Sequence, residues 1–148
     1  MSSNPLVPQG NLNRLAASVI VPNNSALNVT PGFLGKRQIS VAFEGGSTLY
    51  IDTQTGAVTS PEPYMKVTIS IDLLKTQYVS GLWRAAMEQY APLGPLTVRP
   101  DSLIFPNYYF HNCSIQGVRE LSFAGTDASY MVTVGGYYLI NQNLYNLV

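Results

Sequence analysis

Apolar and polar residues alternate one by one in two stretches of the chain, 38–44 and 64–72. The apolar positions are Ile39, Val41, Phe43, Met65, Val67, Ile69 and Ile71. The polar positions are Gln38, Ser40, Glu44, Lys66, Thr68, Ser70 and Asp72. Because successive side chains of a strand point to opposite faces, this period of two predicts two half-buried strands with a core behind them and water in front.

Further stretches rich in β-branched and aromatic residues are separated by Gly, Pro, Asn and Ser turns. They predict strands over residues 15–21, 48–53, 54–60, 96–100, 108–121 and 129–140. Turn signals recur at the spacing typical of antiparallel sandwiches and barrels. The predicted fold class is therefore mainly β, an antiparallel β-sandwich or barrel with one flanking α-helix.

That single helix is predicted between Asp72, as its N-cap, and Pro92, where it ends. Two adjacent rows of apolar residues run along it: Leu74, Tyr78, Leu82, Ala86 and Tyr90 in one, and Val79, Trp83 and Met87 in the other. Together the rows span roughly 200° of the helix, against about 100° for one core contact. Either a loop of the same chain or another subunit has to cover the remainder.

The pattern divides the chain into an N-terminal arm, 1–13, and one domain, 14–148, with a long loop at 22–36. That loop carries four apolar residues that we expect to be exposed in a free monomer: Leu27, Val29, Phe33 and Leu34. They either fold onto the core of their own chain or dock on a neighbouring subunit. A loop of this length in a compact domain is typical of functional segments.

Composition adds the strongest argument for association. Charged residues make up 11% of the 148 residues, against about 25% in a typical soluble domain, and the net charge is zero. Such a chain has few charges with which to protect sheet edges or to stay dispersed. This favours a subunit whose surface is covered by copies of itself.

The same composition disfavours other classes of partner. Lys36–Arg37 is the only adjacent basic pair, which is too little for phosphate binding to nucleic acid. No stretch reaches the roughly 20 apolar residues of a membrane span, so we expect no membrane partner. The single cysteine, Cys113, excludes an internal disulfide.

Candidate chemistry is sparse. His111 is the only histidine, and with Cys113 it provides two metal ligands where a site usually needs three or four. A nucleophilic triad would need the same histidine. The eight carboxylates are scattered among turns and polar faces, which argues against a glycosidase pair. We expect no catalytic site, no metal and no cofactor; the ten tyrosines leave a glycan-binding module as an alternative, since aromatic rings stack on sugars.

Four stretches, in order along the chain, resemble the tail tube proteins of contractile-tailed bacteriophages. They are "LNVTPGFLGKRQISVAFEG" (27–45), "TGAVTSPEPYMKVTISIDLLKTQ" (55–77), "LGPLTVRPDS" (93–102) and "NCSIQGVRELSFAGTDASYMVTVGGYYLINQNLY" (112–145). The resemblance implies a β-sandwich with one helix, assembled as stacked hexameric rings around a channel that conducts DNA. Type VI secretion tubes and other contractile-injection inner tubes are the close alternative.

The resemblance further implies a contractile sheath outside the tube, with tape measure protein and DNA in the lumen. It implies a virion location after assembly in the host bacterial cytoplasm. Because DNA must slide, a channel wall should be neutral to acidic; the candidate lumen residues are Gln38, Ser40, Glu44, Thr68, Ser70 and Asp72. Lys66 departs from that rule. The candidate contacts between subunits or rings are Leu27, Val29, Phe33, Leu34, Trp83 and Met87.

Overall fold

The computed structural model describes residues 8–12, 17–100 and 105–145. The strands in chain order are β1 (Ser18–Ile20), β2 (Leu34–Glu44), β3 (Thr48–Asp52), β4 (Ala57–Pro61), β5 (Tyr64–Leu74), β6 (Pro92–Arg99), β7 (Tyr108–Arg119) and β8 (Ser129–Leu139). The helices are α1 (Tyr78–Gln89) and the short α2 (Gln142–Tyr145), and two single 3-10 turns, η1 (Ser25–Leu27) and η2 (Pro31–Phe33), lie between β1 and β2.

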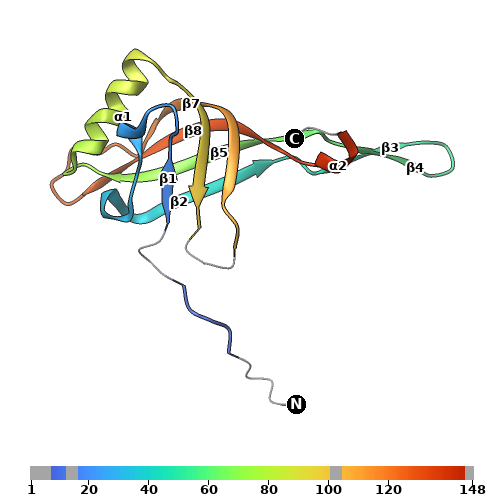
Figure 1. Ribbon diagram of the computed structural model, residues 1–148, viewed down its shortest axis with the longest axis horizontal. Coiled ribbons are helices and arrows are strands. Elements are labelled where there is room, and N and C mark those ends of the chain that lie inside the picture. Colours follow the sequence, from blue (N-terminus) through green and yellow to red (C-terminus); the bar gives the residue numbers. More distant parts are fainter. Residues whose placement is uncertain (1–7, 13–16, 101–104, 146–148) are drawn as a thin grey trace.

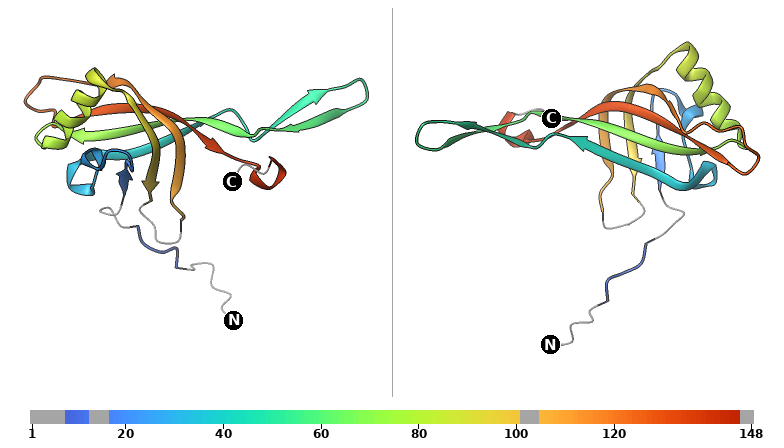
Figure 2. Two further views of the ribbon diagram at one scale, coloured as in Figure 1. Left: turned by 45° about the horizontal axis from the view of Figure 1, so that its top comes forward. Right: turned by 180° about the vertical axis from the view of Figure 1, so that it is seen from behind.

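Six antiparallel strands form one sheet in the order β1-β6-β7-β8-β5-β2. The sheet curls into a half-barrel with α1 across one end (Figure 1). Strands β3 and β4 form a separate hairpin that projects from the opposite end (Figure 2). The predicted class, mainly β with one flanking helix, is confirmed.

The alternation in β5 explains which face of the sheet is buried. Val67, Ile69, Ile71 and Leu73 are buried on the concave side, where they join apolar residues of β8, β6 and β1. Because β5 pairs with β8 over its whole length, from Tyr64 to Leu74, the period of two is held in register across the sheet centre. The core therefore fills the concave face, and the polar positions of the central strands lie on the convex face.

Helix α1 closes one end of this core. Val79 and Trp83 are buried, and the indole Nε1 of Trp83 donates a hydrogen bond to the backbone O of Leu27 at 3.1 Å. The helix begins at Tyr78, and the prediction of Asp72 as its N-cap is wrong. Pairing of β5 with β8 continues to Leu74, so Asp72 is a strand residue.

The loop at 22–36 folds onto its own chain. Val29 forms an isolated bridge with Val19, and η1 packs on α1. Leu27, Val29 and Leu34 are buried in the core, so the expectation that these three are exposed in the monomer is wrong. The physical reason is that the curled sheet and α1 leave an apolar gap that this loop fills.

Aromatic rings fill the concave face away from α1. Phe43 of β2 lies 5.8–6.4 Å, between ring centroids, from three rings of β7 and β8: Tyr108, Phe110 and Tyr138. Rings at such distances attract through their edges and faces. The cluster thus bridges the two sides of the half-barrel, from β2 to β7.

Candidate assembly surfaces

The convex side of four neighbouring strands, β2-β5-β8-β7, is a polar sheet face. Ser40 lies directly opposite Ser70, and Glu44 directly opposite Lys66. Directly opposed residues of an antiparallel pair share a face, so the structure brings Ser40, Glu44, Thr68 and Ser70 together, as the alternation predicts. The Thr68 hydroxyl donates a hydrogen bond to Oε1 of Glu44 at 3.5 Å.

Three of the predicted lumen residues differ from expectation in position or exposure. Gln38 has a φ of 54° and lies where the β2–β5 register shifts, between Leu34 and Ile39, so it is outside the regular ladder. Ser70 is buried beneath Arg119, whose Nη2 donates to its Oγ at 3.5 Å. Asp72 is 1% exposed. Ser40 and Glu44 are thus the exposed members of the set, and Thr68 is half-buried in the regular ladder.

Asp72 is buried and belongs to an ion-pair network. Its Oδ2 accepts a hydrogen bond from the backbone N–H of Arg37 at 3.1 Å, and its Oδ1 accepts one from the Arg37 guanidinium at 3.3 Å. The same guanidinium pairs with Glu120. A Cβ on Gly35 would lie 2.5 Å from Oδ2, so glycine is required there. Removal of one partner would leave a buried charge without compensation.

The polar sheet face is electrically balanced. Its basic groups are Arg37, Lys66 and Arg119, and its acidic groups are Glu44, Asp72 and Glu120. Lys66, which seemed to break the pattern, faces Glu44 across the β2–β5 pair. The face therefore carries charge without a net sign.

Residues of β7 and β8 complete this face, and sequence reasoning missed them. A shallow hollow of about 280 Å³ is lined by Glu44, Lys66, Thr68, Asn112, Ser114, Gln116 and Gly135, among others. The signal was present in the alternation of Ser114 and Gln116 with the buried residues Cys113 and Ile115. It was obscured because the β7–β8 register shifts twice.

A row of aromatic rings lies at the hairpin end of the polar sheet face. Tyr137 of β8 stacks on His111 at 5.7 Å and meets Tyr64 edge to face at 5.7 Å. Lys66 lies opposite Tyr137 in the register. These rings and the neighbouring hollow put stacking surfaces beside hydrogen-bonding groups.

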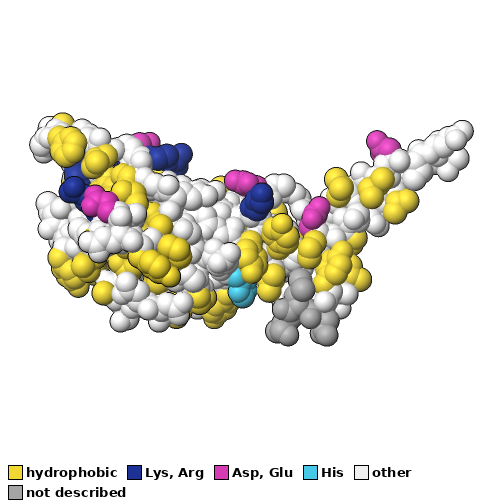
Figure 3. All heavy atoms as spheres, turned by 90° about the horizontal axis from the view of Figure 1, so that it is seen from above, with side chains coloured by type: hydrophobic (Ala, Val, Ile, Leu, Met, Phe, Trp, Pro, Cys, Tyr) yellow, Lys and Arg dark blue, Asp and Glu magenta, His cyan; other side chains and the backbone are white. Residues whose placement is uncertain are grey.

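The β3–β4 hairpin is amphipathic. Leu49, Ile51 and Val58 share one face because Ile51 is directly opposite Val58 and Leu49 is two residues from Ile51. We call these three residues the apolar strip; they are 54%, 50% and 54% exposed. Hydrophobic side chains are visible along this projecting arm in Figure 3. Tyr50 and Thr59 occupy the other face.

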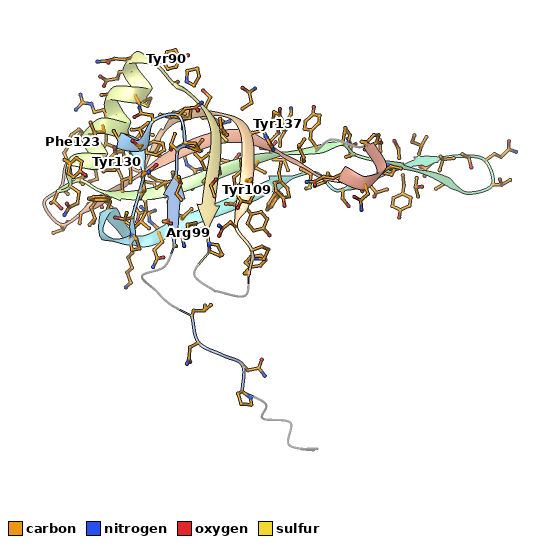
Figure 4. The ribbon with its side chains drawn as sticks, viewed as in Figure 1. Tyr90, Arg99, Tyr109, Phe123, Tyr130 and Tyr137 are labelled. Atoms are coloured by element: carbon orange, nitrogen blue, oxygen red, sulfur yellow. The ribbon has the colours of Figure 1, made fainter. Side chains whose placement is uncertain are left out.

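An apolar groove of about 550 Å³ lies at the other end of the molecule, between α1 and the β7–β8 loop (120–128). We call it the end groove. Its apolar lining comprises Met87, Val118, Leu121, Phe123 and Tyr130, and its polar rim includes Lys75, Arg84 and Glu88. Phe123 is 93% exposed, and it lies with Tyr130 at the α1 end of the molecule (Figure 4).

The predicted contact residues divide into two groups. Trp83 is buried with the three loop residues described above, so these four are core residues of their own chain. Phe33 and Met87 are half-buried. Phe33 packs edge to face on Tyr78 at 5.5 Å, and Met87 lines the end groove.

The outer side of α1 keeps part of the wide apolar arc uncovered. Tyr78, Leu82 and Tyr90 of the first row are exposed, whereas Val79 and Trp83 of the second are buried. A second groove, of about 670 Å³, runs between this side of α1 and the loop at 23–27. The loop and the sheet of the same chain therefore cover only part of the helix.

Metal ligation and thiol reactivity can be judged from the positions of the side chains concerned. In the part of the chain that the structure describes, no three His, Cys, Asp or Glu side chains are gathered where they could hold a metal. Cys113 is buried, and loss of solvation raises the pKa of its thiol to about 11, which keeps it neutral.

Neither the family models nor the curated proteins searched match this chain. No helix in the described ranges is sufficiently long and apolar to cross a membrane.

Proposed function

We propose that this chain is a structural subunit of a tube, the tail tube of a contractile-tailed bacteriophage, built from stacked homohexameric rings. The observation that carries the proposal is the polar sheet face: it is four strands wide and balanced in charge, with Ser40 and Glu44 exposed and Thr68 half-buried. At one side, the polar sheet face ends at the edge strand of the sheet. Such a surface suits the wall of a water-filled channel.

The open edge is β2. It is 11 residues long and pairs with β5 on one side; among the described residues, no strand pairs with its other side. The regular part, Ile39–Glu44, has one charged side chain, Glu44, to discourage pairing with another chain. An edge of this kind is a template for strand addition. Pairing with a copy would extend the polar sheet face around an axis, and closure of the ring would remove the edge.

The charge balance of the polar sheet face fits passage of DNA. A wall with a net positive charge would bind the phosphate backbone through counterion release and hold the DNA in place. Sixfold repetition around the ring would multiply any net charge of this face by six. In this proposal DNA and a tape measure protein occupy the lumen without specific binding, and a contractile sheath surrounds the tube. A type VI secretion or other contractile-injection inner tube would use the same architecture.

Electron microscopy of the purified protein tests the proposal directly, since hollow rings or tubes are visible without a partner.

A Ser40→Cys variant tests whether the polar sheet face lines the lumen of the tube. We expect its thiol to react with a bulky polyethylene-glycol maleimide in the free subunit and to be protected in long tubes, while small N-ethylmaleimide reacts in both. Cys113 is buried, so its background reaction is low. Solid particles, or equal labelling before and after assembly, would contradict a lumen-facing sheet.

One observation favours a second candidate function, glycan binding. The row formed by Tyr64, Tyr137 and His111 lies beside the polar hollow, and sugars bind where aromatic rings adjoin hydrogen-bonding groups. Binding of the wild-type monomer to a glycan array, lost in Tyr137→Ala, would support this alternative. Hollow assemblies that bury the same row would contradict it.

A further inference from the structure

The apolar strip on the β3–β4 hairpin lacks cover within the described chain. Leu49, Ile51 and Val58 are each about half exposed, and the hairpin pairs with no other strand. A two-stranded hairpin is marginally stable in water without a partner surface. The opposite face, with Tyr50 and Thr59, is mixed in character. The strip is thus an exposed apolar surface on one face of the hairpin.

The end groove is a matching recess. Most of its lining is apolar, and Gly81 of α1 leaves space in it, since no atom beyond the adjoining residues and backbone of α1 lies within 4 Å of a Cβ added there. Leu121 and Phe123 are exposed on the loop side. The Lys75 ammonium is bonded to the backbone O of Ser122, which ties the loop to the end of β5. This contact holds the loop that forms one wall of the groove against the end of β5.

The hairpin cannot fill the groove of its own chain, because the β3–β4 hairpin and α1, which lines the groove, lie at opposite ends of the long axis (Figures 1 and 2). A second copy can. We propose that the apolar strip of one subunit docks in the end groove of the next subunit. This inference rests on the self-association proposed above and specifies one of its contacts.

The charges of the hairpin and of the groove rim support a second copy of the chain as the occupant of the groove. Asp52 is the only charged residue between 48 and 61. The rim of the end groove carries two basic groups, Lys75 and Arg84, and one acidic group, Glu88, which pairs with Arg84. A hairpin of charge −1 therefore meets a rim of charge +1. Electrostatic complementarity of this kind selects partner and register more than it adds affinity.

The contact joins two different surfaces, so it is heterologous. A heterologous contact repeats from copy to copy, and it produces a ring if the rotation closes or a linear stack if it does not. Both outcomes are compatible with a tube. The contact is distinct from pairing at the β2 edge, which uses neither the hairpin nor α1.

Cysteine cross-linking between two variants tests the contact. Ile51→Cys and Phe123→Cys are made separately, mixed and oxidised under conditions where the wild type assembles. We expect a covalent heterodimer from the mixture and little from either variant alone. Thr59→Cys, on the other face of the hairpin, is the matched control and should cross-link poorly with Phe123→Cys.

Substitutions give an independent measurement by sedimentation. Ile51→Asp should weaken association by about tenfold or more, because a carboxylate would have to leave water for the apolar lining of the groove. Thr59→Asp, with the same charge on the other face, should leave association near the wild-type value. Gly81→Phe should block the groove in a folded monomer, and Gly81→Ala should not.

A charge exchange completes the design. Asp52→Arg should weaken association, and Arg84→Asp in the same chain should restore it. If Ile51→Asp assembles like the wild type and the mixed cysteines do not cross-link, the docking contact is wrong even where hollow tubes form. If the cross-link forms specifically but no hollow particle appears, the docking contact holds and the tube proposal is wrong.

Discussion

Cys113 shows at the scale of one residue how burial fixes a chemical state. Its side chain lies in the core beside Gly136, where an added Cβ would be 2.7 Å from Sγ. Loss of solvation raises the pKa of the thiol from 9.0 to about 11. Burial also raises the pKa of Tyr130, with a smaller opposing effect from Arg84. Both groups are held neutral, and Tyr130 donates a hydrogen bond to the backbone O of Ser80 at 2.7 Å.

These two shifts predict a loss of stability in alkaline solution. Above pH 9 the unfolded chain releases the Cys113 proton while the folded chain retains it, so rising pH favours unfolding until about pH 11. We expect the contribution of Cys113 to the melting temperature to be constant well below pH 9 and to be lost between pH 9 and 11. Cys113→Ala should make the fall of the melting temperature over this range shallower. An unchanged pH profile in this variant would assign the alkaline loss to other groups.

Asp72 marks the limit of what local sequence shows about a residue. Alternation correctly placed it on the polar side of β5, because period two is a property of neighbouring residues. Its burial depends on Arg37, which is 35 positions away along the chain. The bulge at Gln38 brings the Arg37 backbone N–H toward the carboxylate, and no local pattern encodes that approach. The residue thus appeared as a lumen candidate although it is an internal ion-pair partner.

Helix α1 shows at the scale of an element how an amphipathic pattern is resolved. Its apolar residues were identified from spacing, and Val79 and Trp83 form the buried side. Which part of a 200° arc is covered depends on the path of the loop at 22–36, which reaches the helix through the Trp83–Leu27 hydrogen bond. The helix start could not be placed either, since β5 continues past Asp72 by pairing with β8.

Trp83→Phe tests how strongly α1 depends on that loop. The substitution leaves the buried carbonyl of Leu27 without its donor and removes part of a fully buried ring. We expect a loss of about 2–4 kcal/mol in the free energy of unfolding. Urea unfolding followed by circular dichroism measures it, because Trp83 is the only tryptophan and fluorescence would be lost. Tyr90→Phe, at the exposed end of the helix, should change stability by less than about 0.5 kcal/mol.

At the scale of the whole molecule, polar and apolar surfaces are segregated. The polar sheet face occupies the convex side, the apolar strip one end, and the end groove the other. Sequence alternation identified the β2 and β5 part of the polar sheet face and the residues of the hairpin. It could not show that the hairpin projects away from the body, because the same alternation occurs when both strands join the main sheet. The end groove combines segments far apart in the chain, so no single stretch of sequence indicated it.

This distribution predicts the solution behaviour of the assembly. Contact through apolar surface weakens on cooling and strengthens in sulfate, whereas contact through ion pairs is screened by salt. We therefore expect assembled particles to increase with temperature and with ammonium sulfate, and to change little between low and moderate sodium chloride. Light scattering at fixed protein concentration measures all three. Dissociation by moderate sodium chloride would indicate that charge, and not apolar cover, holds the subunits together.

Where the apolar strip of one layer docks in the end groove of the next, the separation of the two surfaces gives a growing assembly a polarity. The layer at one end of the assembly would leave its apolar strips uncovered, and the layer at the other end its end grooves. The two ends of the assembly would therefore differ chemically. A protein that starts growth would have to imitate a recess or an arm, and the protein that stops growth would have to imitate the opposite feature. One cap could not serve both ends, and elongation would proceed at unequal speeds from the two.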